Sequence, residues 1–254
     1  MSYLRLRQVC LVAPHLDSAA ALISDILGLE ECHRDTNVGK YGLENVLFPI
    51  GPDRFVEVVA PTREGTAAGR FLTRNGGRGG YMLIFDCDAP EPRARAAEAM
   101  GVRLANHIDR ATFQGYQLHP RDCRACFLEF DHTSDGEALD GPYWPAGDGW
   151  QAHVKTDVTQ ALTGVVAATP DPASLSAHWG RIMQVAPAAD GTIKVEAQTI
   201  AFTADPDAER LEALVIAAAD PAGMLARARA TGLETTANAF RLCGVWIRPE
   251  GASA

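Results

Sequence analysis

The stretch Gln8-Val9-Cys10-Leu11-Val12-Ala13-Pro14-His15-Leu16-Asp17, with the apolar run that follows it to Leu27-Gly28-Leu29, decides the fold. Residues 6–13 are predicted to form a strand, and apolar residues at helical spacing predict a helix over 16–27. Gly28 is expected to end this helix, because glycine readily adopts the left-handed conformation found after helices. Strands near 29–35, 43–50 and 54–60 are expected to complete a βαβββ unit.

The same order of elements recurs further along the chain. The second unit is predicted from a strand over 80–87, a helix from Pro90 to Gly101, and strands near 102–108, 112–119 and 125–131. A strand over 162–169 and a helix over 172–184 begin the third unit. The fourth has a strand over 211–218, a helix from Pro221 to Gly232 and a final strand ending at 243–247. Because one unit leaves an apolar sheet face uncovered, units are expected to pair. We therefore predict an α+β fold of four tandem βαβββ modules, paired into two domains with curved mixed sheets.

A segment rich in turn-forming residues separates the two halves. It contains Ser134-Asp135-Gly136, Asp140-Gly141-Pro142 and a run of glycine and proline over 145–149. We predict a first domain over residues 1–132, a linker over 133–160 and a second domain over 161–254. Trp144 and Trp150 are expected to pin this linker to a domain or to line a dimer interface.

The charge balance restricts the kinds of partner. The chain has 254 residues and a formal net charge of −9, which argues against nucleic acid and anionic membranes as partners. No apolar run approaches the roughly 20 residues that a membrane-spanning helix needs, and the first residues lack the features of a signal peptide. We expect a cytoplasmic protein whose partner is a small molecule.

The stretch from Gln8 to Leu29 resembles the signature of the vicinal oxygen chelate superfamily, also called the glyoxalase, bleomycin-resistance and dioxygenase fold. Residues 55–61, Phe-Val-Glu-Val-Val-Ala-Pro, match the fourth strand of that signature, and residues 42–57 resemble its glyoxalase-like branch. The resemblance is strong over 5–131 and weak, but in phase, over 162–248. It implies a divalent metal in the cup of a curved sheet, bound by side chains from the first and fourth strands of two paired units.

Carried over by position, the four implied ligand sites are Gln8, Glu57, Tyr81 and Glu129. Oxygen atoms of Gln8, Glu57 and Glu129 suit a divalent metal such as Mg, Mn, Fe or Ni, with Zn as a further candidate. Tyr81 stands where the family has a histidine, and a phenol with a reference pKa of about 10 is a poor ligand at neutral pH. A metal-free pocket that uses Glu57, Glu129 and Tyr81 for hydrogen bonds is an equal alternative, and a third is that these residues face solvent at the mouth of the cup.

Strand alternation places these groups on one apolar face. Side chains two residues apart share a sheet face, and an apolar cup with a few convergent polar groups is typical of a small-molecule site. The residues expected to contact the small molecule are Cys10, Phe55, Tyr81, Leu83, Phe85 and Phe127.

The resemblance implies two classes of function. One is a metal-dependent lyase or isomerase, in which Glu57 or Glu129 is the catalytic base that removes a proton next to a carbonyl and the metal polarises the oxygens. The alternative is a non-catalytic protein that binds a small molecule without metal, as bleomycin-resistance relatives do. The missing histidine favours the second class modestly.

An extradiol dioxygenase is disfavoured. Its iron ligands would come from the C-terminal half, where the matching positions are Gly164, Ala213 and Trp246, with Ala201 or Phe202 at the fourth strand. None of these side chains can bind iron. We expect the C-terminal half to be a degenerate copy that completes the packing, forms a homodimer or covers the cup.

Other metal-binding or reactive residues are expected to be structural. His119 and His132 are the candidates to replace the missing histidine, but both are expected to lie in surface loops. Cys123 and Cys126 form a CxxC without a second pair at ligand spacing. They are expected to be free thiols in a turn and in a strand.

Overall fold

The computed structural model describes residues 3–251, which fall into two compact units. The first unit comprises residues 3–8, 82–144 and 164–212, and the second comprises residues 9–81, 145–163 and 213–251. This grouping differs from the predicted domains over 1–132 and 161–254, whose boundaries stay a prediction.

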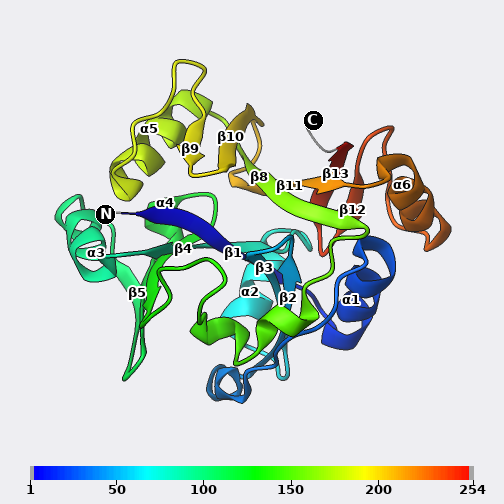
Figure 1. Cartoon of the computed structure of the whole chain (residues 1–254). Coiled ribbons are helices and arrows are strands. Elements are labelled where there is room, and N and C mark those ends of the chain that lie inside the picture. Colours follow the sequence, from blue (N-terminus) through cyan, green and yellow to red (C-terminus); the bar gives the residue numbers. More distant parts are fainter. Residues whose placement is uncertain (1–2, 252–254) are drawn as a thin grey trace. The chain divides into compact units, whose positions relative to one another are not determined.

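Strands β1 to β7 belong to one mixed sheet (Figure 1). Hydrogen bonds join them in the order β2-β3-β1-β4-β7-β6-β5. The pairs β2–β3, β5–β6 and β6–β7 are antiparallel, whereas β4 and β7 are parallel. The strands are β1 (Leu4–Val12), β2 (Leu43–Ile50), β3 (Arg54–Pro61), β4 (Gly80–Cys87), β5 (Leu104–Arg110), β6 (Phe113–Leu118) and β7 (Phe127–Thr133).

Strands β8 to β13 form a second mixed sheet in the order β12-β13-β11-β8-β10-β9. Its parallel pairs are β8–β10 and β11–β13. The two mixed sheets, each interleaved with helices, confirm the predicted α+β class of tandem modules. The strands are β8 (Thr159–Thr169), β9 (Ile193–Val195), β10 (Gln198–Ala204), β11 (Arg210–Ala218), β12 (Phe240–Leu242) and β13 (Val245–Gly251).

The predicted helices are present, and the helices pack against strands of their own unit. In the second unit α1 and α2 contact β3, and α6 contacts β13; in the first, α3 contacts β6 and β7, and α5 contacts β10. Proline occupies the start of α3, α4, α5 and α6, where its missing N–H costs nothing. The helices are α1 (Leu16–Leu22), α2 (Ala67–Arg74), α3 (Pro90–Ala99), α4 (Pro120–Cys123), α5 (Pro172–Met183) and α6 (Pro221–Ala230).

The first helix ends where the sequence predicts. It continues from α1 as a π-helical turn over Ile23–Leu27 and stops at Gly28, which has a left-handed φ of 68°. A side chain at Gly28 would also collide with Val158, because a Cβ atom there would lie 2.7 Å from the Val158 side chain. Both the backbone conformation and the close approach therefore require glycine.

The predicted strand over 29–35 is wrong. Only an isolated bridge joins His33 to Leu47, so the first module has two strands after its helix instead of three. The segment has apolar residues only at Leu29 and Cys32, so it lacks the alternation of a half-buried strand, and it runs directly into a 3-10 helix over Thr36–Tyr41. Helices α2 and α4 were not predicted.

The predicted single strand ending at 243–247 is a hairpin. Strands β12 and β13 pair with Leu242 opposite Val245, and the two residues between them, Cys243 and Gly244, have φ values of 49° and 74°. Two central residues with positive φ are the hallmark of the tight turn that joins twisted antiparallel strands. The glycine at the second position is the sequence signal for this turn.

The two tryptophans of the predicted linker each pack onto an aromatic ring. In the first unit Trp144 stacks on Phe113 with centroids 4.7 Å apart. In the second unit Trp150 meets Phe55 edge-on at 5.0 Å and is almost fully buried. The expectation that these residues pin the segment is confirmed.

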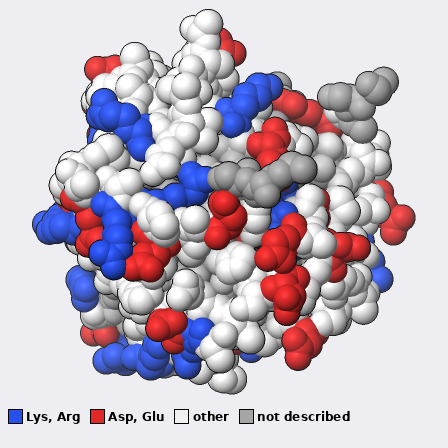
Figure 2. Space-filling view, turned by 60° about the vertical axis from the view of Figure 1, so that its left-hand side comes forward, with Lys and Arg blue, Asp and Glu red and all other residues white. Residues whose placement is uncertain are grey.

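No helix within residues 3–251 has the length and hydropathy needed to cross a bilayer. Figure 2 shows basic and acidic side chains interspersed on one face of the molecule. This face therefore presents no broad basic surface of the kind that binds nucleic acid.

Candidate functional site

Glu57 is a buried carboxylate in the second unit, held by a neighbouring amide. It lies on β3 with 8% of its surface exposed. In the antiparallel register Asn45 of β2 is opposite Val59, which places Asn45 and Glu57 on one sheet face. Asn45 Nδ2 donates to Glu57 Oε1 over 2.7 Å, and Asn45 Oδ1 accepts the backbone N–H of Asp35 over 2.8 Å. The Asp35 N–H fixes which way the amide points, so the amide in turn orients the carboxylate.

Tyr81 is a buried, protonated phenol in the same unit. Its ring meets Phe71 of α2 edge-on, with centroids 4.9 Å apart. Burial raises the pKa of Tyr81 well above its usual value, the nearby Cys10 and Glu57 raise it further, and the charges of Arg70 and Arg74 offset this in part. Tyr81 is therefore a hydrogen-bond donor at neutral pH and not an anionic metal ligand.

Glu129 is the corresponding carboxylate of the first unit. It lies on β7 with 3% of its surface exposed, directly opposite Gln117 of β6. Gln117 Nε2 donates to Glu129 Oε2 over 2.9 Å. The other oxygen, Oε1, lies over Gly115, where a Cβ atom would come within 2.7 Å of it. The carboxylate therefore needs both the amide of Gln117 and the missing side chain of Gly115.

The two amide–carboxylate pairs repeat along the chain. Asn45 precedes Glu57 by 12 residues, and Gln117 precedes Glu129 by the same interval. Both members of the second pair lie 72 residues after those of the first. The sequence analysis identified the carboxylates but missed the amides; the equal spacing in both modules is the signal that could have found them.

Gln8 lies in a polar cluster of the first unit. It is buried on β1, and its Oε1 atom lies 3.2 Å from the hydroxyl of Tyr143. The same hydroxyl lies 3.3 Å from Oδ2 of the fully buried Asp131. Burial, together with the charges of Asp86 and Glu129, raises the pKa of Asp131 well above its usual value. The Gln8 side chain is thus already engaged by a protein donor.

The predicted residues divide between the two units. The second unit contains Cys10, Phe55, Glu57 and Tyr81, all buried. The first unit contains Gln8, Leu83, Phe85, Phe127 and Glu129, of which Phe127 is half-buried and the others are buried. Each unit therefore combines apolar side chains with a carboxylate that an amide orients.

The predicted metal ligands are divided between the two units, with Gln8 and Glu129 in the first and Glu57 in the second. No group of three or more His, Cys, Asp or Glu side chains within residues 3–251 is placed to hold a metal ion. In addition, Glu57, Glu129 and Gln8 each have an oxygen in contact with a protein hydrogen-bond donor. A divalent metal with protein ligands usually takes three or more of them. The predicted set of metal ligands stays a prediction.

The remaining histidine and cysteine candidates have structural contacts in the first unit. His119 caps α4 by accepting the N–H of Arg121 over 3.2 Å. His132 lies on β7, not in the predicted surface loop, and its Nδ1 atom is 3.3 Å from the hydroxyl of Tyr3. Cys123 is the last residue of α4, and Cys126 lies in the bend before β7, not in the strand where it was predicted. Both are fully buried, and burial raises the pKa of both thiols, that of Cys123 to about 12. Protonated, buried thiols are unreactive.

Comparisons with known proteins agree on a family and a fold. A family model described as a glyoxalase-like domain matches residues 9–183. No curated protein matches the chain significantly. The crystal structure of a hypothetical protein from Staphylococcus aureus, 11% identical, covers 98% of this chain and 99% of its own, with a TM-score of 0.67.

Two enzyme structures resemble about half of the chain. Methylmalonyl-CoA epimerase from Streptomyces coelicolor is 22% identical and covers 51% of this chain and 96% of its own, with a TM-score of 0.46. The epimerase from Mycobacterium tuberculosis is 21% identical and covers 51% of this chain and 88% of its own, with a TM-score of 0.45. The full-length match to the Staphylococcus aureus structure shows the fold.

Proposed function

This chain belongs to the glyoxalase-like domain family, and we propose that it binds a small organic molecule through Glu57 and Tyr81 of the second unit. The observation that supports the proposal is the buried Glu57 carboxylate, which Asn45 orients at 2.7 Å. A buried carboxylate costs stability unless its interactions compensate for the lost hydration. A carboxylate kept in such a place is a candidate for function.

The two side chains have complementary roles. Glu57 accepts hydrogen bonds, and Tyr81, whose pKa is raised by burial, donates one. Phe55 and Cys10, both buried, supply apolar surroundings in the same unit. An apolar site with one acceptor and one donor suits a small molecule that carries a hydroxyl or acidic C–H group near a carbonyl.

A second candidate function is a lyase or isomerase that uses the same two groups. Glu57 would remove a proton from the carbon next to the carbonyl, and the Tyr81 hydroxyl would donate a hydrogen bond to the oxygen on which negative charge develops. The orientation of Glu57 by Asn45 favours this candidate, because a base must be held within reach of the proton that it removes. The proton moves to Glu57.

Thermal-shift and NMR measurements test both candidates. A panel of small hydroxy and oxo carboxylic acids is added to the wild type, Glu57→Gln and Tyr81→Phe, and exchange of the C–H next to the carbonyl is followed in D₂O. We expect at least one compound to raise the melting temperature of the wild type and to lose this effect in both variants. Exchange that depends on Glu57 would support the enzyme, and binding without exchange would support a binding protein. If Glu57→Gln and Tyr81→Phe respond to every compound as the wild type does, the proposed site is wrong.

A further inference from the structure

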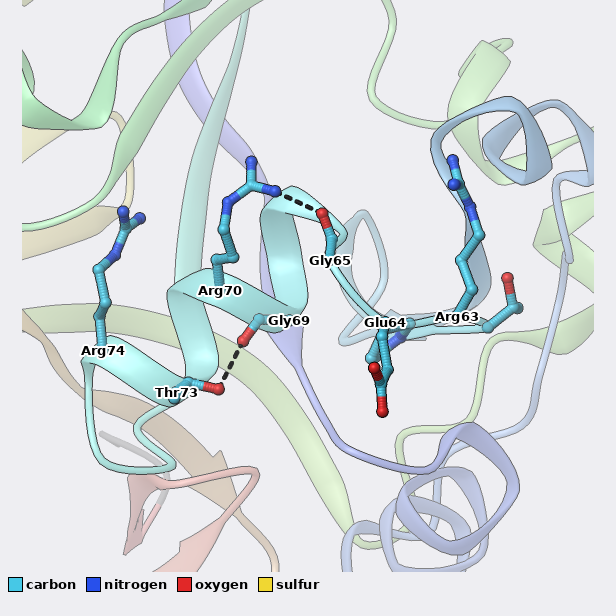
Figure 3. A pocket seen from close by; sticks show the side chains of 9 residues that line it. Arg63, Glu64, Gly65, Gly69, Arg70, Thr73 and Arg74 are labelled. Carbon is cyan, nitrogen blue, oxygen red and sulfur yellow. Dashed lines mark hydrogen bonds between the residues drawn. The ribbon is translucent and has the colours of Figure 1, made fainter.

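A hollow opens on the surface of the second unit where β3 leads into α2 (Figure 3). It has a volume of about 580 Å³ and is lined by residues 61–65 and by one face of α2. Pockets for small organic molecules commonly have volumes of a few hundred cubic ångströms. The hollow is therefore large enough for part or all of such a ligand.

Three arginines line this hollow. Arg70 and Arg74 are one helical turn apart on α2, which places them on the same helix face, and Arg63 comes from the segment between β3 and α2. Figure 3 shows the three guanidinium groups extending to the same side, whereas the carboxylate of Glu64 points the opposite way. We call Arg63, Arg70 and Arg74 the arginine cluster.

The arginine cluster has no acidic partner among the residues that the structure describes. Within residues 3–251, none of its members forms an ion pair; the contact recorded for Arg70 is a hydrogen bond to the carbonyl of Gly65. Like charges four residues apart on a helix destabilise it by roughly 0.2–0.5 kcal/mol. The chain has a formal net charge of −9, so acidic residues that could pair with these arginines are plentiful. Because the three arginines nevertheless form no ion pair with the described residues, they are available to bind an anion from solution.

The N-terminus of α2 does not explain an anion site by itself. The Thr66 hydroxyl already caps the helix by accepting the N–H of Gly69 over 3.0 Å. The Thr73 hydroxyl is likewise engaged, because it donates to the carbonyl of Gly69 over 3.0 Å. The guanidinium groups are therefore the groups that would bind an anion, and their planar fork matches a phosphate or a carboxylate.

We propose that the arginine cluster binds the phosphate or carboxylate group of a small organic molecule. This proposal rests on the proposed function, which describes the rest of the bound molecule. Helix α2 lies beside both sites. Phe71, the residue after Arg70, packs on the ring of Tyr81, and the positive charges of Arg70 and Arg74 interact electrostatically with the Tyr81 hydroxyl. An anionic group at the arginine cluster would place the ligand beside the same helix that covers Tyr81.

Calorimetric titration of the full chain with inorganic pyrophosphate and with citrate tests the inference, and sucrose serves as the uncharged probe. The test variant is Arg70→Gln/Arg74→Gln. The control variant is Arg181→Gln/Arg229→Gln, which removes the same charge from two other exposed helical arginines that have no ion pair among the described residues. Both double variants alter exposed side chains, and circular dichroism checks that each is folded.

We expect at least one of the two anions to bind the wild type, and binding to weaken about tenfold or more in the test variant but less than twofold in the control. Binding should also weaken at high salt. Pyrophosphate alone would assign a phosphate, and citrate alone a carboxylate. Absence of binding by both anions, or equal losses in both double variants, would overturn the inference. If the inference is overturned but Glu57→Gln still loses the thermal shift caused by a hydroxy or oxo acid, the proposed function stands without the arginine cluster.

Discussion

Glu57 and Glu129 occupy matching places in two modules, and each is held by an amide 12 residues earlier. Their surroundings differ. Glu57 has a phenol, Tyr81, within electrostatic reach, whereas Glu129 has the carboxylate of Asp131 as a neighbour. An amide orients both carboxylates, and their neighbours are what distinguish them. We infer that Glu57 serves a ligand and that Glu129 belongs to a structural cluster.

The buried charges around Glu129 hold a loop in place. Arg5 Nε donates to Asp86 over 2.7 Å, and its other nitrogens donate to the carbonyls of Gly136 and Glu137. Arg7 donates to the carbonyl of Leu139 over 2.8 Å. These contacts join β1 to the segment after β7, so Arg5, Arg7 and Asp86 already have structural partners.

The largest effect is expected on breaking this cluster. Asp86→Ala would leave the Arg5 guanidinium buried without its carboxylate, which typically costs about 3–5 kcal/mol. Both side chains are 4% exposed, so water cannot replace the lost partner. Urea unfolding should show a large loss of stability, whereas Glu91→Gln, which breaks an exposed pair with Arg95, should leave the midpoint unchanged. A similar midpoint for both variants would contradict a structural role for this cluster.

A smaller effect is expected from filling the space beside Glu129. In Gly115→Ala the new Cβ atom would meet Glu129 Oε1 at 2.7 Å and the Phe113 ring at 3.1 Å, and overpacking of this kind costs about 1–3 kcal/mol. Gly39→Ala is the matched control, because nothing lies within 4 Å of a Cβ atom there. Thermal unfolding should separate the two variants. Equal melting temperatures would show that the carboxylate can move away at little cost.

The smallest effect is a dependence of stability on pH. Burial raises the pKa of Asp131 above its value in the unfolded chain, so the folded state binds the proton more tightly. Its contribution to stability is present at acidic pH and is lost as the pH rises through the folded pKa. Asp131→Asn should therefore gain stability relative to the wild type as the pH is raised from 4 to 8. A difference in melting temperature that stays constant over this range would contradict a protonated Asp131.

The sequence predicts the two carboxylates better than it predicts the amides that bind them. Alternation along each strand is a local property, and it was enough to place Glu57 and Glu129 on one face of their strands. The partners Asn45 and Gln117 depend on the register between strands, which alternation within one strand does not specify. The repeat of the 12-residue spacing would have supplied that information.

The elements that were not predicted correctly have weak secondary-structure signals in the sequence. Helix α2 is short, contains Gly69 and ends two residues before Gly76, so its propensity is low; the capping hydroxyl of Thr66 was its clearest marker. The segment over 29–35 has apolar residues only at Leu29 and Cys32. Its charged side chains form ion pairs with one another and with α1 instead of completing a strand.

The most direct test of the account compares Glu57→Gln with Glu129→Gln in one ligand titration. Each variant replaces a buried carboxylate by an amide of the same shape, and the compound used is the hydroxy or oxo acid that stabilises the wild type most. We predict that Glu57→Gln weakens binding about 10- to 100-fold, as expected for loss of a hydrogen bond to a charged group, while Glu129→Gln leaves the dissociation constant within a factor of three. The reverse order, or equal losses, would contradict the assignment of the ligand to Glu57.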